Sequence, residues 1–227
     1  VTPRTRMILV NSPHNPSGAV FSRDDLEALA QIVRDTDILV LSDEVYEHIV
    51  FDNALHHSVL THDELAARSF VVSSFGKTYH CTGWKVGYCV APSALSAEFR
   101  KVHQYLTFCT FNAAQWAFAD VLESIPEHYQ NLPAFYQAKR DRFQQLLAGS
   151  RFELLAVPGG YFQLADYSAI SELDDVAFCE WLVAEYKVAA IPLSPFYQTP
   201  PGAKLVRFCF AKNEATLADA ATRLKAV

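Results

Sequence analysis

The sequence contains no apolar run long enough to span a membrane, no CxxC pair and no excess of basic residues. A transmembrane helix needs about 20 consecutive apolar residues, so a membrane-spanning protein is not expected. The formal net charge is −6, and no basic stripe alternates with aromatic residues. This pattern argues against nucleic acid as a partner.

The cysteines and the N-terminus also lack features of exported proteins. The five cysteines stand singly in apolar segments, which is typical of buried free thiols in a reducing compartment. The first residues show no signal-peptide pattern, so we predict a cytoplasmic protein. No metal site is predicted, because the loop histidines have no recognised ligand spacing; they are His48, His56, His57 and His62.

What is present is an ordinary globular composition, with 227 residues of which 51% are apolar and 19% are charged. That length suffices for one large domain or two modest ones. Short apolar runs predict strands at 6–11, 38–42, 69–74 and 85–91. Helical patterns follow Ser22, a predicted N-cap, and recur near 62–67. Strands alternating with helical crossovers predict an α/β fold with a mainly parallel sheet and helices on its faces.

The pattern changes after Ser93. Helical spacing predicts helices at 95–107, 112–123 and 126–148. Beyond Gly149 it is mixed, and the predicted elements are strands at 152–156, 160–166, 188–191 and 204–210 and helices at 174–186 and 213–225. We therefore predict two domains, residues 1–125 and a smaller α+β domain over residues 126–227.

Three polar residues occupy equivalent places along the predicted sheet. Asn15 follows the first strand, Asp43 ends the second, and Lys77 follows the third. Ligands of open α/β sheets bind at the carboxyl ends of the strands, so these residues are expected to converge on one crevice. A lysine at the end of a buried strand is costly unless its charge is used or removed. We predict that Lys77 forms a Schiff base with a carbonyl cofactor.

The surrounding residues suit pyridoxal 5′-phosphate. Lys77 would hold the aldehyde as an internal aldimine, and Asp43 would face the ring nitrogen and keep it protonated. Tyr46 lies three residues beyond Asp43, so its phenol could reach the O3′ oxygen of the ring. Asn15 could donate to the same oxygen. Lys77, Asp43 and Tyr46 are therefore the predicted catalytic residues.

Other residues suit a phosphate and a substrate carboxylate. Ser74 and Lys85 flank Lys77 and are the donor and the cation that a phosphate group requires. Arg207 is a charge within an otherwise apolar strand. Such an arginine needs a partner, and a carboxylate held bidentately is a good one. We predict Ser74 and Lys85 at the phosphate and Arg207 at the substrate.

Four motifs together resemble those of the class I/II aminotransferases of PLP fold type I. They are Asn15-Pro16-Ser17-Gly18, Ser42-Asp43-Glu44-Val45-Tyr46, Ser74-Phe75-Gly76-Lys77 with Thr82-Gly83-Trp84-Lys85-Val86-Gly87, and Arg207-Phe208-Cys209-Phe210-Ala211. The chain is most similar to the branch of methionine, glutamine and kynurenine aminotransferases. The resemblance implies a three-layer α/β/α large domain with a small α+β domain.

The same resemblance implies a function and a set of roles. It implies transfer of an amino group from a methionine-, glutamine- or aromatic-type amino acid to a 2-oxo acid, with pyridoxal 5′-phosphate as cofactor and a homodimer as the assembly. It assigns Lys77 as the Schiff-base lysine and Asp43 as the pyridine partner. It further places Asn15 and Tyr46 at O3′, with Asn15 and Arg207 at the substrate. Ser74 and Lys85 again fall at the phosphate.

Two departures and two alternatives accompany this resemblance. The wider family usually has arginine where Lys85 stands, and small residues where His80 stands. The family also carries a phosphate-binding glycine turn and a stacking aromatic before the point where this chain starts, so we expect the C-terminal part of an aminotransferase. A PLP-dependent C–S β-lyase on the same scaffold is one alternative. A catalytically silent fragment is the other.

Overall fold

The structure is a computed structural model that describes residues 1–227, and its packing divides the chain into two units. The first unit contains residues 1–13 and 20–133, and the second contains residues 14–19 and 134–227. By packing, the division lies after Pro133, later in the chain than residue 126. The domain limits given above remain a prediction. None of the helices combines the length and the apolar character needed to cross a membrane.

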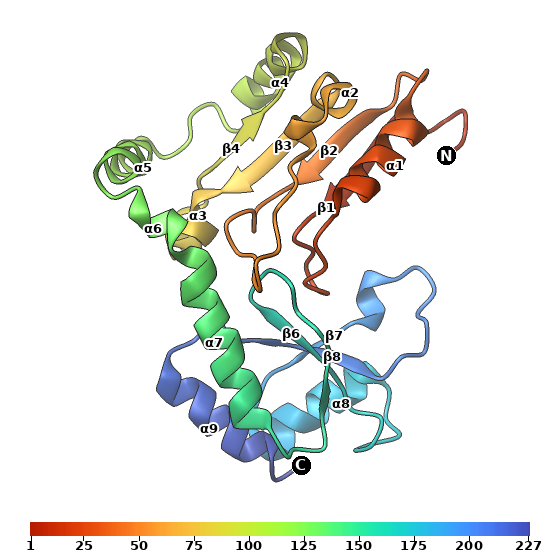
Figure 1. Ribbon diagram of the computed structural model, residues 1–227, viewed down its shortest axis with the longest axis vertical. Helices are drawn as coiled ribbons and strands as arrows, with labels where there is room; N and C mark the ends of the chain where they lie inside the picture. The colour runs from red at the N-terminus through yellow and green to blue at the C-terminus, as the bar shows by residue number, and fades with distance from the viewer. The chain divides into compact units, whose positions relative to one another are not determined.

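The first unit is organised around a sheet in the order β1-β2-β3-β4 (Figure 1). Its strands β1, β2 and β3 are parallel, and β4 pairs antiparallel with β3. The bounds are Met7–Asn11 for β1, Leu39–Asp43 for β2, Ser69–Ser74 for β3 and Gly87–Val90 for β4. The prediction of a mainly parallel sheet within an α/β fold is confirmed.

Helix α1 (Arg23–Val33) shows how local sequence forms these elements. Ser22 accepts a hydrogen bond from the Asp25 amide, and the Asp25 carboxylate accepts one from the Ser22 amide, so both ends of a capping box are present. The buried face of α1 packs with residues of β2 and β3 in one apolar core. That core contains Leu26, Leu29, Ala30, Val33, Val40 and Val71.

The remaining helices of the first unit are short or peripheral. They are α2 (Asp63–Ala66), α3 (Phe75–Thr78), α4 (Ser93–Leu106), α5 (Asn112–Ser124) and α6 (Glu127–Gln130). The single helix predicted over 126–148 is wrong, because the chain forms α6 and then α7 (Leu132–Leu147). Pro133 explains the break. A proline has no amide to donate within a helix interior, but it is tolerated in a first turn.

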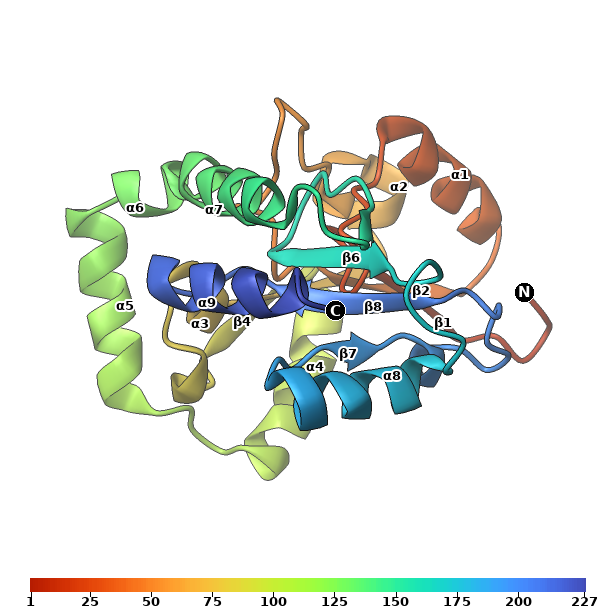
Figure 2. The same ribbon diagram turned by 90° about the horizontal axis from the view of Figure 1, so that it is seen from below.

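The second unit contains an antiparallel sheet in the order β5-β6-β8-β7, of which Figure 2 shows β6, β8 and β7 side by side. The bounds are Glu153–Leu154 for β5, Phe162–Asp166 for β6, Ile191–Pro192 for β7 and Leu205–Cys209 for β8. Aromatic contacts join helices to this sheet. Phe143 of α7 lies 6.1 Å from Phe208 of β8, between ring centroids.

Helices α8 (Asp175–Trp181) and α9 (Glu214–Leu224) complete the second unit. The helix predicted over 174–186 ends at Trp181 and continues as a π-helical turn, Leu182–Tyr186. Strand β7 begins at Ile191, so the strand predicted over 188–191 lies too early in the chain. The other predicted strands and helices of this unit are found within a few residues of their predicted limits.

Candidate active site

Asp43 is the last residue of β2, and the backbone around it is held on both sides. The Asn11 amide side chain donates to the Asp43 carbonyl oxygen at 2.9 Å. The Glu44 amide donates to the Val72 carbonyl oxygen of β3 at 2.9 Å. The Asp43 carboxylate accepts from the Val45 amide at 3.1 Å. Because Asp43 pairs with Val72 in the parallel register, it lies at the same end of the sheet as the residues that follow β3.

A buried glutamate that was not among the predicted site residues fixes the turn after β2. Glu44 is only 2% exposed, and its carboxylate accepts from the Ser42 hydroxyl and the His56 Nε2 at 2.8 Å each. It also accepts from the Val59 amide at 3.1 Å. Burial alone raises the pKa of Glu44, but the hydrogen bonds from His56 and Ser58 outweigh it and hold this pKa below its ordinary value. The adjacency of Glu44 to Asp43 was the only sequence signal.

A second glutamate joins the same turn to the end of β3. Glu47 accepts hydrogen bonds from the hydroxyls of Ser73, at 2.7 Å, and Tyr88. Burial and the Glu47 hydrogen bond raise the pKa of Tyr88 well above its ordinary value, so Tyr88 remains a neutral donor. Tyr46, between the two glutamates, is 3% exposed. The predicted residues Asp43 and Tyr46 therefore stand on a rigid segment.

Lys77 lies in helix α3, directly after β3, and is half-buried. The chain folds closely over this helix. A Cβ at Gly76 would lie 2.9 Å from the Thr82 Cα, and the Cys81 amide donates to the Gly76 carbonyl oxygen at 3.0 Å. Phe75 stacks on Phe118 of α5 with ring centroids 4.8 Å apart. Glycine is therefore required beside Lys77, and the helix has an apolar support.

The two predicted phosphate residues occupy different environments. Ser74 precedes α3, is half-buried, and makes no side-chain cap hydrogen bond to the helix. Lys85 is exposed and has a left-handed backbone with φ of 55°. Its predicted position as the first residue of a strand is wrong, since β4 begins at Gly87. A Cβ at Gly87 would lie 2.3 Å from the Ser73 carbonyl oxygen, which explains the tight pairing that starts there.

The second unit brings Asn15 and Arg207 into direct contact. The Arg207 guanidinium donates to the Asn15 Oδ1 at 2.6 Å and lies 4.1 Å over the Phe162 ring, measured to its centroid. Because an arginine only donates, the amide oxygen of Asn15 must face it and the Nδ2 group is the donor end. The turn that carries Asn15 packs closely on its own unit, as a Cβ at Gly18 would lie 2.8 Å from the Gly159 carbonyl oxygen.

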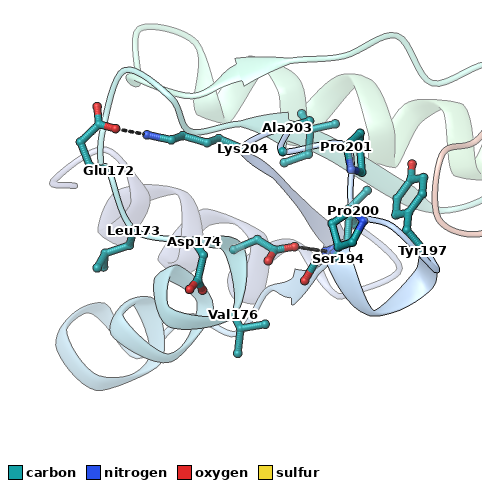
Figure 3. A pocket seen from close by; sticks show the side chains of 14 residues that line it. Glu172, Leu173, Asp174, Val176, Ser194, Tyr197, Pro200, Pro201, Ala203 and Lys204 are labelled. Atoms are coloured by element: carbon teal, nitrogen blue, oxygen red, sulfur yellow. Dashed lines mark hydrogen bonds and ion pairs between the residues drawn. The ribbon is translucent and has the colours of Figure 1, made fainter.

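A cavity of about 460 Å³ in the second unit lies elsewhere, between the start of α8 and the segment 193–205 (Figure 3). None of the predicted site residues lines it. Its buried carboxylate, Asp175, accepts from the amides of Leu193 and Ser194 at 2.7 and 2.6 Å. On its rim, Lys204 forms an ion pair with Glu172. These charged groups are satisfied within the protein, so this cavity is not the candidate active site.

The first unit thus has the character of an α/β enzyme, with a carboxylate in the last residue of one parallel strand, a phenol shortly after it and a lysine amine after the neighbouring strand. The chain belongs to the aminotransferase class I and II family, whose sequence model matches residues 1–224. This match confirms the resemblance drawn from the four motifs. The convergence of Asn15 with Asp43 and Lys77 on one crevice remains a prediction.

Individual relatives support the same family. The chain is 57% identical to a methionine aminotransferase of Escherichia coli (strain K12) over 222 residues, which are 98% of this chain and 58% of that protein. It is 39% identical to a probable N-succinyldiaminopimelate aminotransferase of Mycobacterium tuberculosis over an alignment of 233 positions, which covers 99% of this chain and 59% of that protein.

A solved structure agrees with the fold. The structure of an Escherichia coli protein with a methionine aminotransferase function matches with a TM-score of 0.96 and 56% identity, covering 100% of this chain and 60% of that one. The fold is therefore that of the PLP aminotransferases of fold type I. The chain spans about 58% of the length of the first of these relatives.

Proposed function

We propose that the protein is a pyridoxal-phosphate-dependent aminotransferase that moves an amino group from an amino acid to a 2-oxo acid. The observation that carries this proposal is the placement of Asp43 at the end of β2 and of Lys77 directly after β3, which are parallel neighbours. Methionine-, glutamine- and aromatic-type amino acids are the proposed donors. The names of the relatives, a methionine aminotransferase and a kynurenine–oxoglutarate transaminase, support this class.

The residue types at the ends of β2 and β3 fit pyridoxal 5′-phosphate. They combine an amine, a carboxylate, a buried phenol at Tyr46, and a hydroxyl at Ser74 that does not cap α3. The exposed cation of Lys85 completes the set. When bound, this cofactor supplies an aldehyde that condenses with amines and a ring that stabilises negative charge at the substrate Cα. Lys77 would hold the aldehyde, Tyr46 and Asn15 would donate to its phenolic oxygen, and Ser74 and Lys85 would contact its phosphate.

Asp43 and Lys77 have separate proposed roles in the reaction. The Asp43 carboxylate would accept a hydrogen bond from the ring nitrogen of the cofactor and stabilise its protonated form. The Lys77 Nζ would act as the general base and acid that moves the substrate Cα proton. The hydrogen bonds from the Asn11 side-chain amide and the Glu44 backbone amide hold the Asp43 segment in place.

Arg207 is the proposed ligand of the substrate carboxylate. A guanidinium presents a planar fork of donors that matches a carboxylate bidentately. The Asn15 oxygen and the Phe162 ring fix the plane of this fork, because a cation over an aromatic face is attracted to it. Arg207 therefore orients the substrate, and the amide of Asn15 couples it to the turn after β1.

The test compares Lys77→Ala with the surface control Lys101→Ala in the complete gene product. Lys101 is paired with Glu98 on exposed α4. Lys77→Ala is expected to abolish transamination, the visible absorbance of the bound cofactor, and borohydride-trapped labelling of the chain. Lys101→Ala is expected to retain all three. Turnover that survives in Lys77→Ala contradicts the proposal.

The C–S β-lyase alternative is not favoured, because the relatives named above are aminotransferases. An assay of the 2-oxo acid that keeps the carbon skeleton of the donor, set against release of ammonia and pyruvate, separates the two reactions.

We further propose a homodimer. A surface at the end of α4 and the start of α5 supports it, because its apolar side chains are at least 62% exposed. This aromatic surface consists of Tyr105, Leu106, Phe108, Phe111 and Trp116.

A further inference from the structure

Helix α6 contacts the helix that carries Lys77, although the two are far apart in sequence. The His128 Nε2 of α6 lies 2.9 Å from the Thr78 carbonyl oxygen of α3, and Figure 1 shows the two helices side by side. A carbonyl oxygen can only accept, so the Nε2 atom carries a proton and donates. Thr78 is the residue directly after Lys77 and is 8% exposed.

The carbonyl that His128 reaches needs an external donor. Thr78 is the last residue of a four-residue helix, and the last four carbonyls of any helix have no partner within it. Within the turn, the Tyr79 amide is bonded to Phe75 and the Cys81 amide to Gly76. The His128 side chain thus supplies, from a distant element, the donor that the end of α3 lacks.

The His128 ring also packs against the two residues that follow this carbonyl. It stacks on Tyr79 with centroids 5.0 Å apart and meets His80 edge-on at 5.3 Å. His80 has a left-handed backbone with φ of 57°, a conformation that costs a non-glycine residue about 1 kcal/mol or more. The packing of His80 on His128 gives His80 a physical role.

The neighbouring residue of α6 reaches the other half of the candidate site. The Tyr129 ring lies 5.1 Å from the His48 ring, between centroids, and His48 follows Tyr46 and Glu47 on the turn after β2. One short helix therefore contacts both segments that carry the proposed cofactor residues of the first unit. These two contacts allow α6 to hold both segments.

We propose that His128 is a positioning residue that fixes the Lys77 helix through the hydrogen bond to Thr78. The proposal deepens the proposed function and rests on it for the role of Lys77. The proposed role depends on the Nε2–H donor of His128 and not merely on its ring. The stacking on Tyr79 can be retained without the hydrogen bond, and the hydrogen bond can be retained without the stacking, so the two contributions are separable by substitution.

The first experiment measures amide hydrogen exchange in the cofactor-free complete gene product. Loss of one hydrogen bond is expected to speed exchange at the Tyr79 and Cys81 amides roughly fivefold. His128→Phe keeps a ring and loses the donor, so it should show this increase, whereas His128→Gln keeps an N–H donor and should stay within about twofold of wild type. Amides of β1 and β2 report whether each variant is folded.

The matched control is His103→Phe, because His103 also stacks on an aromatic ring, Phe99 at 5.6 Å, on exposed α4. It should leave exchange at Tyr79 and Cys81 unchanged. Wild-type exchange in His128→Phe overturns the proposal. Exchange in His128→Gln as fast as in His128→Phe also overturns it, since the ring and not the donor would then be responsible.

The second experiment separates this proposal from the proposed function. Pyridoxal phosphate is added to each protein, and the rate of borohydride-trapped attachment at Lys77 is followed by peptide mass spectrometry. His128→Phe should slow attachment about fivefold, and His128→Gln should restore it. No attachment at Lys77 in wild type overturns the proposed function. Attachment at the wild-type rate in His128→Phe overturns only the positioning role.

Discussion

Glu44 is a buried carboxylate whose contribution to stability depends on pH. Its pKa is below the ordinary value of 4.5 despite burial, because His56 and Ser58 donate hydrogen bonds to it. A carboxyl whose pKa is lowered by folding contributes stability above its unfolded pKa. That contribution is lost as the pH falls through the lower folded value. The turn that carries Asp43 is therefore expected to loosen in acid.

Glu44→Gln tests this contribution. At neutral pH the substitution should lower the free energy of unfolding by about 3 kcal/mol, because it breaks a buried pair and leaves His56 without its carboxylate. The difference between the variant and wild type should shrink as the pH falls below 4.5. Urea denaturation across this range measures both. Glu98→Gln, in an exposed pair, should change stability by less than about 0.5 kcal/mol, and a constant difference at all pH values contradicts the argument.

Lys85 combines a proposed contact with a strained backbone, and substitutions separate the two. Lys85→Arg should keep cofactor affinity within about threefold, because it retains the charge. Lys85→Ala and Lys85→Gly should each weaken cofactor affinity roughly tenfold or more, since both remove a charged donor to phosphate. Glycine adopts the left-handed conformation freely, so an effect of backbone strain alone would spare Lys85→Gly. Fluorescence titration measures the affinity, and wild-type affinity in Lys85→Gly contradicts the phosphate role.

Single residues also show what sequence could not reveal. The side-chain types of Lys77, Asp43 and Arg207 indicate their chemistry. The strand pattern places Asp43 at the end of one strand, Lys77 after another and Arg207 within a third. Neither feature reveals that His56 reaches Glu44, or that Asn15 faces Arg207 across 192 positions of sequence. Such contacts depend on how distant loops pack. The left-handed backbone of Lys85 is equally invisible in sequence, because tertiary packing imposes it on a residue that does not prefer it.

At the scale of elements, strand β4 depends on a glycine at its first residue. A Cβ at Gly87 would lie 2.3 Å from a backbone oxygen of β3, while nothing lies within 4 Å of a Cβ at Gly83. Gly87→Ala should therefore destabilise the protein by about 3 kcal/mol or more, since the backbone cannot yield cheaply. Gly83→Ala should be neutral or slightly stabilising. Thermal and urea unfolding compare the two, and equal stability of the variants contradicts this reason for the glycine.

Helices and strands with strong local sequence signals were predictable, and the elements that were predicted wrongly have physical explanations. Ser22 and Asp25 predict the start of α1, and apolar runs bounded by polar turns predict β1, β2 and β3. The break between α6 and α7 was missed although Pro133 signals it, because the apolar spacing continues across the proline. Strand β7 has only two residues, Ile191 and Pro192. So short a strand is defined by its partner β8 and not by its own periodicity.

For the whole molecule, the aromatic surface at the end of α4 and the start of α5 is the feature that indicates a subunit interface. Phe108 is 83% exposed and has a left-handed backbone with φ of 61°, which is uncommon for a bulky residue. Tyr105 beside it is 87% exposed. Exposed rings of this kind are enriched where subunits meet, and a few of them supply most of the binding energy.

The homodimer is tested by replacing Phe108 with asparagine and Tyr105 with glutamine together. Asparagine tolerates the left-handed conformation and glutamine favours helix, so the fold should persist while two rings are removed. If this surface meets a second copy, the dimer dissociation constant should rise about 100-fold or more, because such rings contribute about 2 kcal/mol each. Analytical ultracentrifugation of the complete gene product measures it. Leu55→Ser, at a residue 68% exposed in a loop, is the control and should not change the constant, and an unchanged dimer in the double variant contradicts the proposed interface.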